Sequence, residues 1–257
     1  MSPNPIAAAL RNRFEADALL GAKVLPIRIL PPAAQNEPVL SRPPVPAEQI
    51  EARRIALAQI DDAEVKPCTR CALATTRTKT VFGVGSPAAR IMFIGEAPGH
   101  DEDVSGEPFV GRAGQLLTDM IEKGMGLRRE DVYICNVLKC RPPGNRNPAS
   151  DEIAACRDYL HRQVEIIQPE VIIALGGPAA QTLLNTREGI TRLRGRWHDF
   201  FPSGTSLVGE PIPLMPTFHP AYLLRDPSEK GKAWADLKTV MARLGIPIPE
   251  RKKNDSD

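Results

Sequence analysis

The stretch "RIMFIGEAPGHDEDVSGEPFVG", residues 90–111, contains the transition that decides the fold. After Arg90 it begins with a short apolar run, a pattern that predicts a strand buried inside a sheet. The chain then passes directly into a loop in which acidic side chains stand among glycines and prolines. Such a loop binds a metal ion, positions a water molecule or only connects two elements, and the rest of the chain is needed to choose between these functions.

Apolar runs and amphipathic segments alternate along the chain after residue 90. We expect three further strands, at residues 131–138, 170–176 and 211–220. Helices are expected at residues 111–125, 148–168, 178–184 and 228–245, the second with Ser150 as its N-cap and the last ending at Gly245. This alternation indicates an α/β fold with a mostly parallel sheet of four strands, covered by helices on both faces. Ligands bind at the carboxyl ends of the strands in such sheets, which is where the acidic loop, Asn136 and His219 are expected.

The N-terminal part of the chain differs from the rest in composition. The protein has 26 prolines among 257 residues, about twice the usual share of roughly 5%, and six of them fall within residues 31–46. We expect a short helix over residues 4–20, an extended Pro-rich linker over residues 30–49 and a helix over residues 47–59. The predicted domains are therefore a flexible extension (1–55), a main domain (56–246) and a polar tail (247–257). The extension could dock a protein partner or act only as a tether.

Charge and hydropathy narrow the class of protein. The formal net charge is +2, and 42% of the residues are hydrophobic, which is ordinary for a globular protein. No apolar stretch approaches the roughly 20 residues of a membrane span, and the N-terminus lacks a secretion-signal pattern, so we expect a cytoplasmic protein without membrane contact. Arginines are frequent in the second half, where they either line a groove for a polyanion or form a solvated surface.

Four of the five cysteines lie in polar surroundings. Cys68 and Cys71 form a C-x-x-C pair, Cys140 follows the second expected strand, and Cys156 lies on the next expected helix. Four such thiols suit a site for zinc or for an iron–sulfur cluster, and their spacing does not decide between the two. A disulfide is disfavoured in a cytosolic chain, and a redox dithiol would need a strand before it. Cys135 is expected to be a buried thiol.

Six motifs together resemble the family 4 uracil-DNA glycosylases. They are "CTRC", "GEAPG", "PFVGRAG", "NVLKCRPPGNRNP", "ACR" and "FHPAYLLRDP", which follow one another in the order and spacing of that family from about residue 58 to 245. The resemblance implies a three-layer α/β/α sandwich and a monofunctional enzyme that removes uracil from single- and double-stranded DNA in base excision repair. It also implies a monomeric, bacterial-type protein that acts on DNA at the nucleoid. A structural 4Fe–4S cluster held by Cys68, Cys71, Cys140 and Cys156 is implied as well.

The resemblance also assigns roles around a flipped-out uracil. Phe109 stacks on the base, the amide of Asn136 reads its edge, and His219 faces the 2-carbonyl, on which negative charge collects as the bond breaks. Glu96 orients water, while Gly95 and Ala97 let the backbone approach the nucleotide. Glu102 and Asp103 are secondary candidates for the water, and Glu102 could line the side of the pocket where the methyl group of thymine would sit. A Mg²⁺ or Ca²⁺ site in this loop is disfavoured because it lacks regularly spaced oxygen ligands.

Residues expected at the DNA come from two loops. Arg141 and Arg146 lie in the segment that the cluster would arrange, and Arg225 would hold a phosphate. Leu223 and Leu224 would fill the gap left by the flipped base, although either one could instead belong to the core. The segment after Asn136 has neither the insertion nor the histidine of the branch that binds DNA covalently, so turnover is expected.

Two other functions remain as alternatives. One is a catalytically weak iron–sulfur DNA-binding module of the same fold, which Glu96, Asn136 and His219 argue against. The other is an iron–sulfur electron carrier, for which the sequence suggests no partner cofactor. Loss of base release in Asn136→Ala distinguishes the enzyme from both.

Overall fold

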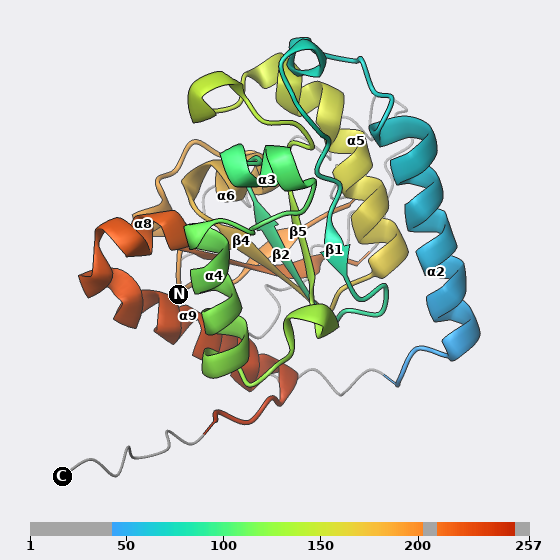
Figure 1. Ribbon diagram of the computed structural model, residues 1–257. Coiled ribbons are helices and arrows are strands. Elements are labelled where there is room, and N and C mark those ends of the chain that lie inside the picture. Colours follow the sequence, from blue (N-terminus) through green and yellow to red (C-terminus); the bar gives the residue numbers. More distant parts are fainter. Residues whose placement is uncertain (1–42, 203–209, 250–257) are drawn as a thin grey trace, which may run out of the picture. The chain divides into compact units, whose positions relative to one another are not determined.

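The computed structural model of the protein describes residues 43–202 and 210–249 (Figure 1). The helix expected over residues 4–20, most of the Pro-rich linker and the tail beyond residue 249 lie outside the described residues. Helix α2 (Ala47–Ile60) continues across the domain boundary expected between residues 55 and 56, and it buries Leu57 and Ile60 against the main domain. No helix in the described ranges is long and apolar enough to cross a membrane.

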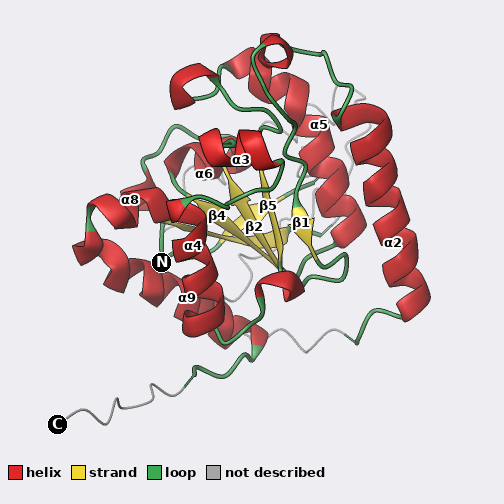
Figure 2. Cartoon of the chain, viewed as in Figure 1, coloured by secondary structure: helices red, strands yellow, loops and turns green. Residues whose placement is uncertain are grey.

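One sheet forms the centre of the described chain (Figure 2). Its order is β1-β3-β2-β4-β6-β5, in which β3 (Tyr133–Asn136), β2 (Ile91–Gly95), β4 (Val171–Leu175) and β6 (Ile212–Thr217) are parallel. These are the four strands that the sequence predicts. Within residues 43–202 and 210–249 the sheet has six strands, because β1 (Val84–Gly85) pairs antiparallel with β3 and β5 (His198–Phe200) pairs antiparallel with β6. Segments of two and three residues are too short to produce a recognisable period, which is why the expected count of four is too low.

The parallel strands are buried on both faces, so alternate residues feed two separate cores. Met92 and Ile94 of β2 face the core beneath α2 and α5 (Ser150–Ile167), whereas Ile91 and Phe93 face the core beneath α4 (Arg112–Asp119) and α9 (Lys230–Leu244). Figure 1 shows α2 and α5 side by side, whereas α4 and α9 contribute residues to the same core on the other face of the sheet. The α/β fold and its three layers are thereby confirmed.

The remaining helices are short and lie near the carboxyl ends of the strands. They are α3 (His100–Ser105), α6 (Gly177–Leu184), α7 (Ile190–Leu193) and α8 (Pro220–Arg225). The long helices match the predictions, and α9 ends at Gly245 in the left-handed conformation (φ 65°).

The N-cap predicted for α5 is wrong by one residue. Ala149 holds the N-cap position and Ser150 begins the helix. The Ala149 N–H donates to Glu152 Oε2 at 2.8 Å, so the N3 carboxylate satisfies the backbone donor of the N-cap residue, as in one half of a capping box.

The strand order provides room for a site at the carboxyl ends of the parallel strands. From β2 the chain moves to β3 on one side and then crosses to β4 on the other. Such a reversal separates the loops that follow the strands and leaves a crevice at their carboxyl ends.

Candidate active site

A pocket opens at the carboxyl ends of the parallel strands, where the crevice is expected. Its walls come from the loops after β2, β3, β4 and β6. Its lining includes Glu96, Ala97, Gly99, Glu102, Phe109, Asn136, Asn145, Arg146, Gly176, Thr191, His219 and Arg225. The structure thus brings together all the predicted catalytic residues.

Gly95 allows the floor of the pocket to form. It pairs with Asn136 across β2 and β3, and a Cβ atom at Gly95 would lie 2.3 Å from Asn136 Oδ1 and 2.6 Å from Phe109 Cζ. Any side chain here would displace both the amide and the ring. Gly95 therefore acts by its lack of a side chain.

The Asn136 side chain is buried without a protein partner. Its residue is 2% exposed, and its Oδ1 finds no hydrogen bond within the described part of the chain. Buried amide oxygens in native proteins are nearly always bonded, so an exception calls for an explanation. A ligand that supplies the missing bond is a direct explanation here, because Asn136 lines the pocket.

Phe109 is held in a backbone conformation that a non-glycine residue rarely adopts, with φ of 55°. Glu102 Oε1 accepts from the N–H groups of Val110 (2.9 Å) and Gly111 (3.1 Å), and Arg129 Nη2 donates to Phe109 O at 3.1 Å. A Cβ at Gly114 would lie only 1.8 Å from Phe109 O. Several contacts thus fix one strained residue, as is common where a ring must be presented to a ligand.

The two secondary candidates in the acidic loop have structural partners. The carboxylate of Glu102 also accepts from the Gly99 N–H at 3.0 Å, so three backbone donors bind it and it helps to organise the loop. Its Oε2 nevertheless fills the space beside Gly99, 2.7 Å from where a Cβ would be, and Glu102 remains on the pocket wall. Asp103 is 3% exposed and accepts from the Thr78 N–H at 2.9 Å, so it ties two loops together.

His219 has a defined tautomer. Its Nδ1 accepts from the Ala221 N–H at 3.1 Å, so in the neutral ring the proton is on Nε2. Burial, and then the positive charge of Arg225, lower the pKa of His219 to about 4. The ring centroid lies 5.6 Å from that of Phe109. The pocket therefore holds a neutral imidazole that can donate one hydrogen bond.

Glu96 differs from Glu102 in having an uncommitted carboxylate. Its backbone oxygen accepts from the Leu138 N–H at 3.0 Å, whereas its side chain makes no hydrogen bond within residues 43–202 and 210–249. Desolvation raises the pKa of this half-buried carboxyl above the usual 4.5. Its backbone is thus fixed, and its carboxylate is free to act on a ligand or a water molecule.

The residues predicted to contact DNA separate into groups. Arg225 is exposed, lines the pocket and forms no ion pair in the described chain. Arg146 also lines it, but its guanidinium is paired with Glu152 at 2.6 and 2.9 Å. Arg141 lies outside the lining and contacts Asn145 Oδ1 at 2.7 Å and His100 Nδ1 at 3.1 Å.

The two leucines of α8 have different surroundings. Leu223 is 1% exposed and packs with Phe218 and Ala233, so it cannot enter DNA without unpacking the core, and its assignment as a wedge is corrected. Leu224 is partly exposed.

Three residues at the site were missed by the sequence analysis. Asn145 and Thr191 add polar groups to the lining, and Arg129 holds the backbone of Phe109. The "GNRNP" turn was a signal for Asn145, but nothing local to Thr191 or Arg129 indicates the pocket.

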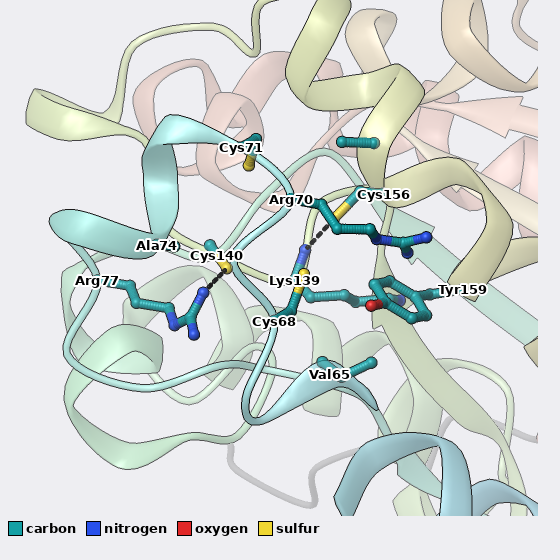
Figure 3. Close-up of a pocket in the computed structure, with 11 residues that line it drawn as sticks. Val65, Cys68, Arg70, Cys71, Ala74, Arg77, Lys139, Cys140, Cys156 and Tyr159 are labelled. Atoms are coloured by element: carbon teal, nitrogen blue, oxygen red, sulfur yellow. Dashed lines mark hydrogen bonds between the residues drawn. The ribbon is translucent and has the colours of Figure 1, made fainter. Parts of the chain in front are cut away.

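A second pocket gathers the four cysteines predicted to act together (Figure 3). Cys68 and Cys71 are half-buried, and Cys140 and Cys156 are buried. Arg77 Nη1 donates to Cys140 Sγ and the Lys139 N–H to Cys156 Sγ, each at 3.4 Å. Cys135 lies inside β3, fully buried and outside this pocket, as expected.

The donor set in the cysteine pocket has the chemistry of a metal site. Four thiols line one pocket, although in the described residues no three Cys, His, Asp or Glu side chains are already arranged to hold a metal ion. A multi-iron cluster is wider than one ion and takes four cysteine ligands. Burial raises the pKa of Cys140 to about 11, so a bound metal and nearby cations such as Arg77 would be needed to keep it a thiolate.

Comparison with known proteins agrees with this geometry. Residues 82–238 match the model of the uracil DNA glycosylase superfamily. The type-4 uracil-DNA glycosylase of Thermotoga maritima is 48% identical over 178 residues, which cover 69% of this chain and 88% of that protein. The type-4 enzyme of Archaeoglobus fulgidus is 44% identical over 199 residues (75% and 97%), and a type-5 uracil-DNA glycosylase of Thermus thermophilus is 31% identical over 147 residues (51% and 67%). Together with the pocket and the four convergent cysteines, these matches show that the chain belongs to the uracil-DNA glycosylase superfamily and, within it, to the type-4 group.

Proposed function

We propose that this protein hydrolyses the N-glycosidic bond of uracil in DNA and so starts base excision repair. The observation that carries the proposal is the buried Asn136 amide, whose Oδ1 has no hydrogen bond within the described residues, next to the ring of Phe109, whose backbone is held at a φ of 55°. The type-4 relatives are named for uracil-DNA glycosylase activity. Glycosylases act on a nucleotide turned out of the helix, which requires a pocket of this kind.

Recognition of the base is assigned to Phe109 and Asn136. A ring face binds any base, whereas the side-by-side acceptor and donor of an amide match the 3-NH and 4-carbonyl of uracil. Cytosine presents the reversed pair and would leave both groups unsatisfied. The selectivity then comes from Asn136, and Phe109 supplies affinity.

Departure of the base is assisted by His219. Its Nε2–H is the one hydrogen bond that the neutral ring can donate, since Nδ1 is occupied by the Ala221 N–H. A fixed donor at the 2-carbonyl stabilises the negative charge that develops on uracil. Its low pKa lets it act without being protonated near neutral pH.

Water attack is assigned to Glu96. Its unbonded carboxylate can orient the water and offset the positive charge on the sugar, as carboxylates do in glycoside hydrolysis. Asn145 is a second polar group that could hold the water.

We infer that Cys68, Cys71, Cys140 and Cys156 hold a 4Fe–4S cluster. When bound, the cluster would cross-link three parts of the chain: the segment before β1, the loop after β3 and helix α5. The four thiols that line one pocket support this, as does membership of a family that generally contains such clusters.

The DNA partner is read from the charges at the rim. Arg225 can hold a phosphate, and Leu224 can occupy the space left by the flipped base. No lysine lines the pocket in the described part of the chain, so we propose that the base is removed without cleavage of the strand. We also propose that the protein acts as a monomer, on single- and double-stranded DNA. A docking role for residues 1–55 remains a proposal.

The test uses the full chain and an end-labelled oligonucleotide with a single uracil. After incubation, hot alkali breaks the strand wherever a base is missing. We expect cleavage at uracil, none at cytosine or thymine in its place, and a collapse of cleavage in Asn136→Ala. A protein with intact cluster colour that releases no uracil from single- or double-stranded DNA would be a binding module, and the proposal would be wrong.

A further inference from the structure

Lys139 is a fully buried lysine between the two pockets. It is 1% exposed, which lysine rarely tolerates, because removing its ammonium from water is costly unless hydrogen bonds replace the lost hydration. It does not line the active-site pocket, and no step assigned above uses it.

Its contacts reach both sites at once. The Nζ donates to the backbone oxygen of Asn136 at 2.8 Å and to Gln163 Oε1 at 2.6 Å. Its own N–H donates to Cys156 Sγ at 3.4 Å, as Figure 3 shows, and its carbonyl accepts from the Val81 N–H at 2.7 Å. One residue therefore joins the cysteine pocket to the backbone of the proposed base reader.

Gln163 keeps the ammonium group in place. Its Nε2 donates to Phe82 O and to Tyr133 Oη, both at 3.0 Å, so its Oε1 is oriented toward Lys139. All these groups are buried, and hydrogen bonds in a buried network are stronger than in water and help to specify one arrangement.

We propose that Lys139 is a positioning residue that holds Asn136 in its base-reading orientation and connects that orientation to the integrity of the cysteine pocket. The proposal rests on the proposed function. No hydrogen bond from the described residues holds Asn136 Oδ1, so the orientation of the amide depends on the backbone of Asn136 and on the packing over Gly95. A misplacement of about 1 Å at a reacting site can cost roughly 100-fold in rate.

The connection also extends to Glu96. The two residues between Asn136 and Lys139 donate their N–H groups to the end of β2 and the residue after it. Val137 donates to Gly95 O at 2.9 Å, and Leu138 donates to Glu96 O at 3.0 Å. The short segment from 136 to 140 thus supports the reader and the proposed water-orienting residue before it reaches Cys140.

A double-mutant cycle between Lys139 and Asn136 tests the proposal. Lys139→Met keeps an unbranched side chain as far as the ε position and removes the Nζ donors. We expect it to lower single-turnover uracil release by roughly 10–100-fold in the wild-type background, and to have little further effect in Asn136→Ala. We also expect it to weaken binding of an oligonucleotide with 2′-fluoro-deoxyuridine, which resists cleavage, while iron content and the visible absorption of the cluster are retained.

Two further variants separate positioning from packing. Lys139→Arg keeps donors but fits the space less well, so it should retain more activity than Lys139→Met, whereas a packing role predicts the reverse order. Arg162→Met is the matched control, because Arg162 precedes Gln163 on α5 and pairs with Glu64, away from β3. It should leave uracil release unchanged.

The outcomes are distinct. An equal loss from Lys139→Met in both backgrounds would overturn the positioning role while leaving the proposed function intact. A wild-type protein without uracil release would instead overturn the proposed function. If Lys139→Met does not fold or loses its iron, Gln163→Met replaces it in the cycle, because it removes the acceptor that orients Nζ together with the Nε2 donor to Phe82 and Tyr133. Loss of iron from both would show that the network supports only the cysteine pocket and would contradict the proposal.

Discussion

Replacing Asn136 with alanine should separate the activity of the protein from its stability. In the proposed complex, the amide satisfies the 3-NH and the 4-carbonyl of a desolvated uracil. Without it, each of these groups is left unpaired at a cost of roughly 1–3 kcal/mol. The sum, about 2–6 kcal/mol, corresponds to a loss of roughly 30- to 20,000-fold in kcat/KM.

Stability should respond differently to the same change. Asn136 Oδ1 has no hydrogen bond within the described residues, so its truncation removes a buried polar atom that the folded protein does not satisfy. That gain offsets the lost packing, and we expect the free energy of unfolding to change by less than about 1 kcal/mol.

Uracil release under single-turnover conditions and thermal unfolding of the same preparations measure the two quantities. Asn147→Ala is the control, because Asn147 is exposed and lies outside the pocket. A threefold or smaller loss of activity would show that Asn136 does not read the base. A fall in stability as large as the fall in transition-state stabilisation would show that its amide is structural.

Three further predictions concern other parts of the two sites. Activity should fall as the pH drops through the pKa of Glu96, which is raised above 4.5, because the Glu96 carboxylate must be ionised. His219, with a pKa of about 4, should stay neutral over that range. Glu96→Gln should remove this acid limb from the pH–rate profile, and a limb that persists would point to another group. Arg225→Gln should weaken binding to all sequences alike and lower the slope of log K against log [salt] by about 1, whereas an unchanged slope would place Arg225 away from phosphate. Cys140→Ser should lose the visible absorption of the cluster and lower the unfolding temperature, and retention of both would show that Cys140 is not a ligand.

The acidic loop shows where sequence reasoning succeeds and where it ends. The loop was correctly located at a strand end, because that follows from a buried run passing into glycines and acids. Glu96 and Glu102 could not be ranked by composition. The turn of α3 brings Glu102 back onto three backbone N–H groups while Glu96 stays unbonded, and this difference depends on the path of the whole loop.

The same limit applies to Leu223 and Leu224. Adjacent residues on a helix point in different directions, but which direction is inward depends on where α8 meets Phe218 and α9. Likewise, the sequence does not show that Arg146 pairs with Glu152, six residues later, instead of being available for DNA.

By itself, the sequence determined the alternation of strands and helices, the separation of four cysteines in polar segments from the buried Cys135, and the order of motifs along the chain. These are local properties, because hydrophobic period, turn residues and spacing are written in consecutive positions. Only the tertiary structure decided which polar groups the protein itself satisfies, such as Lys139 Nζ, and which have no hydrogen-bond partner among the described residues, such as Asn136 Oδ1 and the Nε2–H of His219. Hydrogen-bond satisfaction and burial arise from contacts between distant segments, so they exist only once the chain has folded.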